Sequence, residues 1–500
     1  MKRNALVIAI STLLFSFFFY QQKAGINVLL FTISLLTVFL IDKPVRLKDT
    51  RWLIYAALSL VTGFFVAWHG TVISVMANVA ALSVLAVHSL LPKSSFFPSI
   101  LYALYSYISS FIYFIIDLTE AKPKPVIVEV SEGETAKKPK LETGAKLVIG
   151  IIGLAVIVVF VFLYRKANPV FKEFTDNINL DFISTRWLAF TFLGFLLMYG
   201  FFFIRHIPGL FKKDTTEPAN LNRNTVLAKE NMFLGFKMDA FTEGVIVMVF
   251  LGILNLILLL LNVLDISFLT NGSNLPTDVT YSDYVHRGVG TLIVSVIFVI
   301  LIVMYFFRGA LNFYEKSSSV RLLTTIWLAQ NVIMLASTAY RNAIYISEYS
   351  LTYRRIGVYV WLLLTAVGII STIYKVSGKR SAWYLIRTNG WAFFTAILLL
   401  GTVNWDVMIA RYNSRDVNNV DYEYLMRMNN NALPYIYSAA QTSDPGKSFD
   451  FDNDFHTNRF ELLLLKDDID DKIIEFRHKY ENQSWKSWNF DDMETYQLFK

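Results

Sequence analysis

The stretch from residue 245 to residue 264 reads VIVMVFLGILNLILLLLNVL, and its only polar side chains are Asn255 and Asn262. A helix rises about 1.5 Å per residue, so about 20 apolar residues cross the hydrocarbon core of a bilayer, which is roughly 30 Å thick. Lipid offers the backbone no hydrogen-bond partners, whereas a helix satisfies its own backbone groups. The stretch therefore predicts a membrane-spanning helix.

Similar apolar runs recur along the whole chain. The 500 residues are 55% hydrophobic and only 17% charged, whereas soluble domains are usually about 25% charged. The sequence therefore predicts an all-α protein, a polytopic transmembrane helix bundle of about 12 spans. Cysteine is absent, which excludes disulfides, thiolate metal sites and cysteine nucleophiles. The predicted spans lie near residues 5–20, 25–42, 52–69, 71–91, 97–117, 147–164, 187–204, 242–264, 289–307, 321–340, 355–374 and 389–405.

Two polar segments divide these runs into domains. Residues 120–146 are rich in Lys, Glu and Pro, and this composition predicts a flexible linker. The linker separates N-terminal membrane helices at 1–119, with about five spans, from C-terminal membrane helices at 147–412, with about seven. The tail at 413–500 carries 10 Lys and Arg against 17 Asp and Glu and has apolar positions at helical spacing. We expect it to form a small, mostly helical, acidic soluble domain.

The basic residues of the loops give conflicting predictions for sidedness. Cytoplasmic loops are enriched in Lys and Arg. In the C-terminal half the loops at 308–321 and 375–387 are the most basic, which predicts that the tail lies outside the cytoplasm. The basic residues at the N-terminus and at 43–51 predict a cytoplasmic start. Twelve crossings do not allow both, so one predicted span does not cross or one crossing is missing; the first helix and the region 205–240 are the weakest assignments.

Polar and aromatic residues gather in three segments: 281–288 (YSDYVHRG), 339–355 (AYRNAIYISEYSLTYRR) and 404–413 (NWDVMIARYN). Even numbers of predicted crossings separate the loops that hold them, so they share one membrane face with the tail. One interpretation is anchoring, because Tyr, Trp and Arg commonly line helix ends and Arg pairs well with carboxylates.

Two sharper interpretations of these segments remain open. The first is an anion or lipid head-group site, because basic pockets between membrane helices bind such groups. The second is catalysis by a carboxylate or imidazole base, although the spacing identifies no reaction. The catalytic candidates are Asp283, His286 and Asp406. The candidates for the head-group or ion-pair cluster are Arg287, Arg341, Glu348, Arg354, Arg355 and Arg411.

The tail also contains a run that resembles a calcium-binding loop, formed by Asp450, Asp452, Asp454 and Glu461. Phe455 stands where such a loop needs Gly for its sharp turn, so a solvated acidic loop is the preferred interpretation and no metal is expected. No nucleotide-binding or hydrolase motif occurs. We therefore expect no cofactor, and the charge pattern predicts no nucleic-acid partner.

The three polar segments resemble a family of bacterial multi-pass inner-membrane proteins known only as a domain of unknown function. The shared patterns are Tyr-x-x-Tyr-x-x-Arg-Gly at 281–288, Leu-Thr-x-x-Arg ending at Arg355, and Asn-x-Asp-x-x-Ile-Ala-x-x-Asn at 404–413. Ser350 stands where the family tends to have Gly. A tail motif is also similar, at Asp421, Tyr424, Leu425, Ala432, Leu433 and Pro434. The resemblance covers about 240–440 and implies no particular activity.

We expect a multi-pass protein of the bacterial cytoplasmic membrane, surrounded by membrane lipids. The first hypothesis is a non-enzymatic envelope scaffold or signalling component, whose polar membrane face and acidic tail at 413–500 bind a protein partner. The alternative is a membrane-embedded enzyme acting on a lipid-linked or phosphate-bearing substrate. A transporter is the third hypothesis, and it is disfavoured because the span interiors are nearly free of charged residues.

Overall fold

The computed structural model describes residues 2–42, 44–120, 163–176, 184–228, 232–271, 281–314, 316–415, 420–442 and 459–500, with a few isolated positions between 153 and 161. Within these residues the chain is almost entirely helical, so the predicted all-α fold class is confirmed. One antiparallel pair of two-residue strands, β1 (Met232–Phe233) and β2 (Phe236–Lys237), is the exception in this part of the chain. The predicted linker at 120–146 and most of the predicted span at 147–164 lie outside the described residues.

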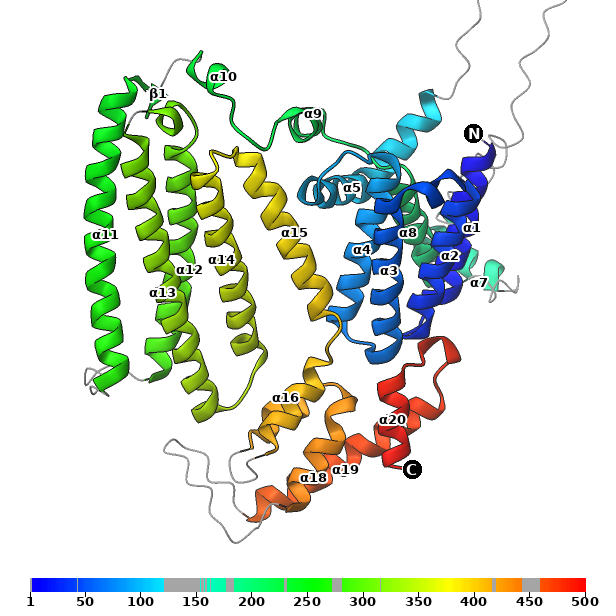
Figure 1. Ribbon diagram of the computed structural model, residues 1–500. Helices are drawn as coiled ribbons and strands as arrows, with labels where there is room; N and C mark the ends of the chain where they lie inside the picture. The colour runs from blue at the N-terminus through cyan, green and yellow to red at the C-terminus, as the bar shows by residue number, and fades with distance from the viewer. Residues whose placement is uncertain are drawn as a thin grey trace, which may run out of the picture.

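The N-terminal helices form the first of two groups (Figure 1). Helix starts and ends follow local chemistry: the Asp49 carboxylate accepts the backbone N–H groups of Arg51 and Trp52 and so caps one helix, which ends at Gly70 with φ of +63°. Such a cap satisfies N–H groups that have no partner within the helix. The elements are α1 (Lys2–Phe19), α2 (Ile26–Asp42), η1 (Pro44–Lys48), α3 (Thr50–His69), α4 (Val72–Leu90), α5 (Phe96–Glu120), α7 (Pro169–Asp176) and α8 (Thr185–Phe202).

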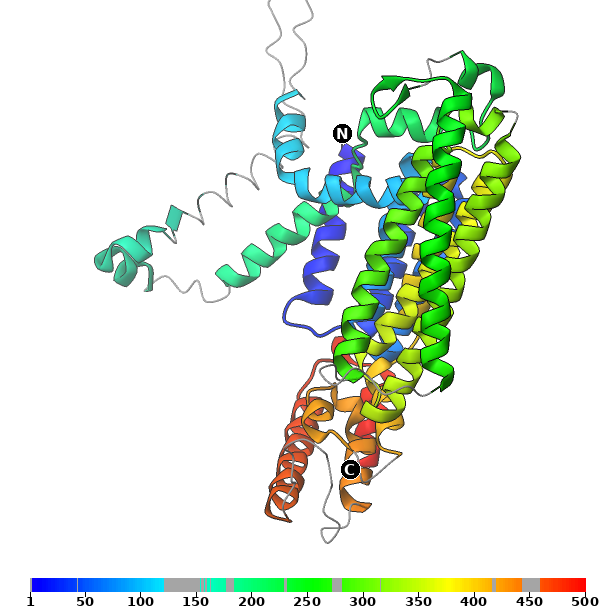
Figure 2. The same cartoon turned by 90° about the vertical axis from the view of Figure 1, so that its left-hand side faces the viewer.

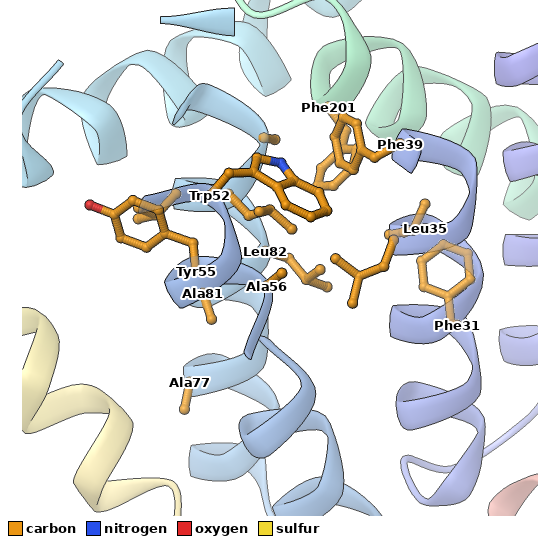
Figure 3. Packing of buried hydrophobic residues seen from close by; sticks show 14 of the residues in the cluster. Phe31, Leu35, Phe39, Trp52, Tyr55, Ala56, Ala77, Ala81, Leu82 and Phe201 are labelled. Carbon is orange, nitrogen blue, oxygen red and sulfur yellow. The ribbon is translucent and has the colours of Figure 1, made fainter. Parts of the chain in front are cut away.

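An aromatic core joins α2, α3, α4 and α8. Figure 3 shows Leu35 and Phe39 of α2 on the side of Trp52 of α3, with Phe201 of α8 beside Phe39. The ring centroids of Phe39 and Phe201 are 5.4 Å apart. Aromatic pairs at such spacings add to the packing energy of a core, so the many Phe residues of the chain serve helix packing here.

The C-terminal helices form the second group, and α15 lies between the two groups (Figure 1). Its Phe394 ring stacks on Phe96 with centroids 4.3 Å apart. A Cβ at Gly401, just after its last turn, would lie 2.5 Å from the Cβ of Ala77 in α4. The elements are α9 (Pro208–Thr216), α10 (Arg223–Leu227), α11 (Ala240–Asn271), α12 (Tyr281–Phe306), η2 (Ala310–Phe313), α13 (Ser317–Tyr349), α14 (Tyr353–Ser377) and α15 (Ala382–Leu400).

Seven of the described helices are long and apolar enough to cross a membrane, or eight if α15 and the following α16 (Trp405–Asn413), bent by 65°, form one span. Shorter apolar helices at Ala5–Phe19, Ile26–Ile41 and Val294–Phe306 lie where the sequence predicts further spans. The protein is therefore a multi-pass membrane protein, and the number of about 12 spans stays a prediction.

One end of the two helix groups is rich in basic residues, and the C-terminal segment packs against the other end. We call one end the basic face; it holds the segments 44–51, 92–95, 203–228, 232–239, 307–314, 316–319 and 378–381. The opposite end is the tail face, against which the C-terminal segment packs (Figure 1). On the basic face, the buried Asp214 carboxylate accepts the backbone N–H of Ser95 at 2.7 Å and lies 3.6 Å from Nε of Arg387, so it ties both helix groups together.

Helix α5 lies across the basic-face end of the N-terminal helices rather than alongside them (Figures 1 and 2). Ser95, just before its first turn, bonds Asp214. In its middle, Ser106 Oγ accepts the backbone N–H of Arg205 at 2.8 Å. Near its end, Asp117 pairs with the Arg205 guanidinium. Since residues 203–216 follow α8 on the basic face, both ends of α5 lie on that face.

The C-terminal segment is helical and packs under the tail face. Its apolar cluster combines Ile436 and Ile469 of the tail with Ile409 of α16 and with Ile346 and Leu351 from the α13–α14 connection. The tail core is therefore shared with the membrane helices. The elements are α17 (Tyr422–Met426), η3 (Asn430–Ala432), α18 (Leu433–Thr442), α19 (Arg459–Glu481), η4 (Trp485–Ser487) and α20 (Phe490–Leu498).

Candidate functional site

The α13–α14 connection and α16 are joined by a two-way amide contact. The Asn413 side chain accepts the backbone N–H of Leu351 at 2.7 Å and donates to the Leu351 carbonyl at 2.9 Å. The preceding Ser350 has φ of +68°, a conformation that glycine adopts without steric cost. A Gly would therefore suit this position. Two of the three polar segments are thus in direct contact.

Asp406 lies beneath this connection and is only 6% exposed. Its carboxylate accepts the hydroxyl of Tyr353 at 2.8 Å, and the backbone N–H of Tyr353 donates to the hydroxyl of Tyr424 at 3.0 Å. Lys472 of α19 donates to the carbonyls of Met426 and Met428 at 2.6 and 3.0 Å. Burial lowers the pKa of Lys472, and the negative charge of Asp406 opposes that shift. Asp406 therefore joins α16 to α14, and Tyr424 joins the tail to the same tyrosine of α14.

Arg355 closes the C-terminal end of α13. Its guanidinium donates to the carbonyls of Tyr349 and Ser350 and lies 4.2 Å from the ring centroid of Tyr345. Cations at a helix C-terminus bond the last carbonyls, which lack partners within the helix, and interact favourably with the helix dipole. The position of Arg355 is that of a helix cap.

Arg341 belongs to a polar ladder between α11 and α13. Its guanidinium pairs with Asp265, whose carboxylate also accepts the Ser337 hydroxyl. Deeper in the same interface, Asn262 donates to the carbonyl of Gln330 at 3.2 Å. Gln330 in turn donates to the Asn255 side chain at 2.9 Å. Polar pairs of this kind hold membrane helices together, so Asn255 and Asn262 of the apolar stretch 245–264 serve helix packing.

The remaining predicted site residues either are exposed at the surface or have side chains outside the described part of the structure. Glu348, Arg354 and Arg411 are exposed. The backbone of 281–288 begins α12, but its side chains are outside the described part of the structure, as are the candidate calcium ligands. In the part that is described, no group of three or more His, Asp or Glu side chains is placed to hold a metal ion. The residues without described side chains are Asp283, His286, Arg287, Asp450, Asp452, Asp454 and Glu461.

The contact between the tail and the N-terminal helices is not predicted by any pattern in the sequence. Asp491 of α20 accepts from the Asn404 side chain at 2.5 Å and lies 2.8 Å from Nδ1 of His69. The other ring nitrogen of His69 lies 3.2 Å from the carbonyl of Thr402. Both ring nitrogens therefore lie beside acceptor oxygens of residues far away in the sequence. No spacing in the sequence links residues so far apart along the chain.

The contacts of Tyr353, Asp406, Asn413 and Asp491 hold the tail and the helices together, and we call this set the joint. Arg341 and Arg355 contact a carboxylate and backbone carbonyls of the protein itself. Asp406 accepts from a tyrosine of a neighbouring helix. Charged groups used in this way fix the relative positions of helices and tail, because a buried ion or hydrogen-bonding group is costly when it loses its partner.

Comparison with known proteins gives one match. Residues 9–439 match the family described as "Domain of unknown function (DUF4153)". No curated protein and no solved structure matches the chain. The match covers both helix groups and the first part of the tail, in agreement with the resemblance drawn from the three polar segments.

Proposed function

We propose that this chain, which belongs to the DUF4153 family, is a non-enzymatic scaffold or signalling component of the bacterial cytoplasmic membrane. Its tail is the element that binds a protein partner. One observation supports the proposal: the described charged candidates contact other parts of the chain, and Tyr424 and Asp491 of the tail contact helices of both groups. Such a joint gives a partner a rigid platform.

The joint spans both helix groups. Asp406 and Asn413 connect the tail side to α14 and to the α13–α14 connection, and Asp491 reaches His69 at the end of α3. Elements held at several distant points lose the freedom to move independently. A partner that binds the tail is therefore coupled mechanically to the helices of both groups.

The chemistry of the exposed tail surface indicates the kind of partner. Helix α19 exposes a run of carboxylates, and they lie outside the contacts of the joint. Complementary charge speeds association and selects partners, so we infer a partner with a basic surface. The exposed acidic residues are Asp467, Asp468, Asp470, Asp471 and Glu475.

The arrangement of α5 supports a tail outside the cytoplasm. With both ends of α5 on the basic face, α5 adds no crossing, and the N-terminus and the tail then lie on opposite sides. This removes the conflict between the two halves of the sequence, because the basic N-terminus and the basic loops now share one face. Lys and Arg mark the cytoplasmic side, so the basic face is cytoplasmic and the tail is external.

Labelling of single cysteines tests this topology, because the natural chain has none. We expect Ser438→Cys in the exposed part of the tail to react with a membrane-impermeant maleimide in intact cells. Ser319→Cys on the basic face should react only after lysis. Lys93→Cys and Ser131→Cys, before and after α5, should both react only after lysis. Labelling of these two positions from opposite sides would show that α5 crosses and would overturn the assignment.

Replacement of Asp406 separates the scaffold from the enzyme alternative. Asp406→Ala leaves the part-buried Tyr353 hydroxyl without its charged acceptor, and we expect a loss of about 2 kcal/mol of stability with reduced abundance in the membrane. Adding Tyr353→Phe should recover part of that loss, since the unsatisfied hydroxyl is then gone. The exposed Arg411→Ala is the control and should leave abundance unchanged. Unchanged abundance of Asp406→Ala would contradict the structural role and favour Asp406 as a catalytic base.

A further inference from the structure

A polar hollow lies where the tail meets the turn between α1 and α2. It has a volume of about 400 Å³ and lies between that turn and the connection from α19 to η4. In Figure 1 the red C-terminal segment lies against this end of the N-terminal helices. The lining residues are Gln21, Gln22, Lys23, Lys479, Asn482, Gln483, Ser484 and Ser487.

The lining offers many hydrogen-bond donors and positive charge. It contains two ammonium groups, four side-chain amides and two hydroxyls, and among its residues there is no carboxylate and no aromatic ring. Lysine binds phosphate as a point charge, and amides and hydroxyls bond the neighbouring oxygens of a polyol. The set therefore fits a phosphate that carries hydroxyl groups. Two carboxylates lie near these lysines: Glu475 forms an exposed pair with Lys479, and Asp492 interacts electrostatically with Lys23.

The wall of the hollow is fixed by its own contacts. Ser487 is 4% exposed; it accepts the backbone N–H of Lys23 at 3.0 Å and its hydroxyl lies 3.0 Å from Oε1 of Gln22. Gln21 has φ of +55°, an uncommon conformation for a residue other than Gly, and one that is found at ligand sites. The two lysines are exposed, so their side chains are available to a ligand from outside.

The position of the hollow relative to the membrane indicates the source of the phosphate. It follows the last turns of α1, where Phe17, Phe18, Phe19 and Tyr20 precede Gln21. Aromatic residues at helix ends lie at the level of the lipid head groups. Lys486 lies at the same level: its ammonium donates to the carbonyl of Phe17 at 2.7 Å and is 4.1 Å from that ring centroid. The surrounding tail is acidic, so these lysines form a local exception.

We propose that this hollow binds the phosphate of an anionic lipid head group, with Lys23 and Lys479 as the cationic contacts. The bound lipid then bridges the α1–α2 turn and α19, so that the lipid composition affects how firmly the tail is held. This site is separate from the arginines singled out in the sequence. It does not depend on the tail having a protein partner or lying outside the cytoplasm.

Titration of the purified full-length protein in a neutral detergent tests the proposal. The probe is dioctanoyl phosphatidylglycerol, and the measurement is its apparent affinity from the shift in thermal unfolding and from native mass spectrometry. We expect Lys23→Gln and Lys479→Gln each to weaken binding about fivefold, since a Lys near an anionic head group contributes about a factor of five. Both side chains are exposed, so the variants should fold. Lys466→Gln in the same helix as Lys479 is the matched control and should bind as the natural protein does.

Two further probes test whether the net negative charge and the lipid part of the ligand are needed for binding. Dioctanoyl phosphatidylcholine should bind more weakly, because its choline group repels the lysines. If it binds equally well, the net negative charge of the head group does not drive binding and the proposal is wrong. Inorganic phosphate should bind more weakly than the lipid; equal binding with the same dependence on both lysines would overturn the lipid assignment. Unchanged affinity of the lipid in both lysine variants would overturn the site itself.

Discussion

Gly25→Ala should release the tail from the N-terminal helices. Gly25 lies in the α1–α2 turn, and the tail backbone passes directly over it. A Cβ at this position would lie 2.8 Å from the carbonyl oxygen of Ser487 and closer still to that of Trp488. Backbone atoms of a packed segment have no rotamer by which to move aside, so the clash is relieved only by displacing η4.

Displacement of η4 also removes the hydrogen bonds of the docked segment. The backbone N–H of Ile26 donates to the carbonyl of Trp488 at 2.8 Å, and that of Lys23 donates to the Ser487 hydroxyl at 3.0 Å. Overpacking costs typically about 1–3 kcal/mol and each lost bond about 1 kcal/mol. We expect the free energy of tail docking to fall by about 3 kcal/mol, which raises the undocked population about a hundredfold.

Hydrogen exchange of the tail measures this effect. Amides at 484–490 and 23–27 should exchange about a hundredfold faster in Gly25→Ala than in the natural protein, because their protection depends on docking. Gly209→Ala is the matched control, since a Cβ there meets no atom within 4 Å. Equal protection in both variants would show that the turn and η4 are not held together as described.

Asp265→Leu should destabilise the C-terminal helices strongly. Asp265 is 8% exposed and pairs with Arg341, whose side chain is 14% exposed. Removing one partner of a buried ion pair leaves the other charge uncompensated, which typically costs about 3–5 kcal/mol. The Ser337 hydroxyl loses its acceptor as well. We expect a large fall in the temperature of thermal unfolding in detergent and in the amount of protein in the membrane.

The double replacement Asp265→Leu with Arg341→Met should recover most of this loss. Apolar residues of similar volume often replace a buried ion pair at little net cost. The exposed pair of Arg427 and Glu423 provides the control, and Glu423→Gln should change stability by less than about 1 kcal/mol. If the double variant remains as unstable as the single one, Arg341 does more than neutralise Asp265, and an anion-binding role for it regains support.

The helical class of the protein could be predicted from local sequence because the bilayer imposes a local rule. A run such as 245–264 forms a helix whatever its neighbours are, since lipid leaves the backbone no other way to satisfy its hydrogen bonds. The packing role of Asn255 and Asn262 follows from the same environment, in which an amide seeks a partner on the next helix.

The role of the charged residues could not be predicted in this way. The sequence predicts that Arg341, Arg355 and Asp406 lie on one membrane face, and this placement is compatible with a ligand pocket as well as with anchoring. Which of the two roles they have depends on which atoms lie within about 3 Å of each side chain. Arg355 of α14 contacts carbonyls at the end of α13 and Asp406 contacts a tyrosine, and both contacts arise only when the chain is folded.

The sequence by itself determined that this protein is an assembly of apolar helices with an acidic tail, because burial in lipid and solvation of charge act on each segment separately. Tertiary structure alone decided how α5 lies, where the tail docks and which lysines line the hollow. Apolar composition allows α5 to cross a membrane, but its contacts with residues 203–216 hold it along one face. Gly25 and Ser487 meet although they lie at opposite ends of the chain, and only the packing of the helices brings them together.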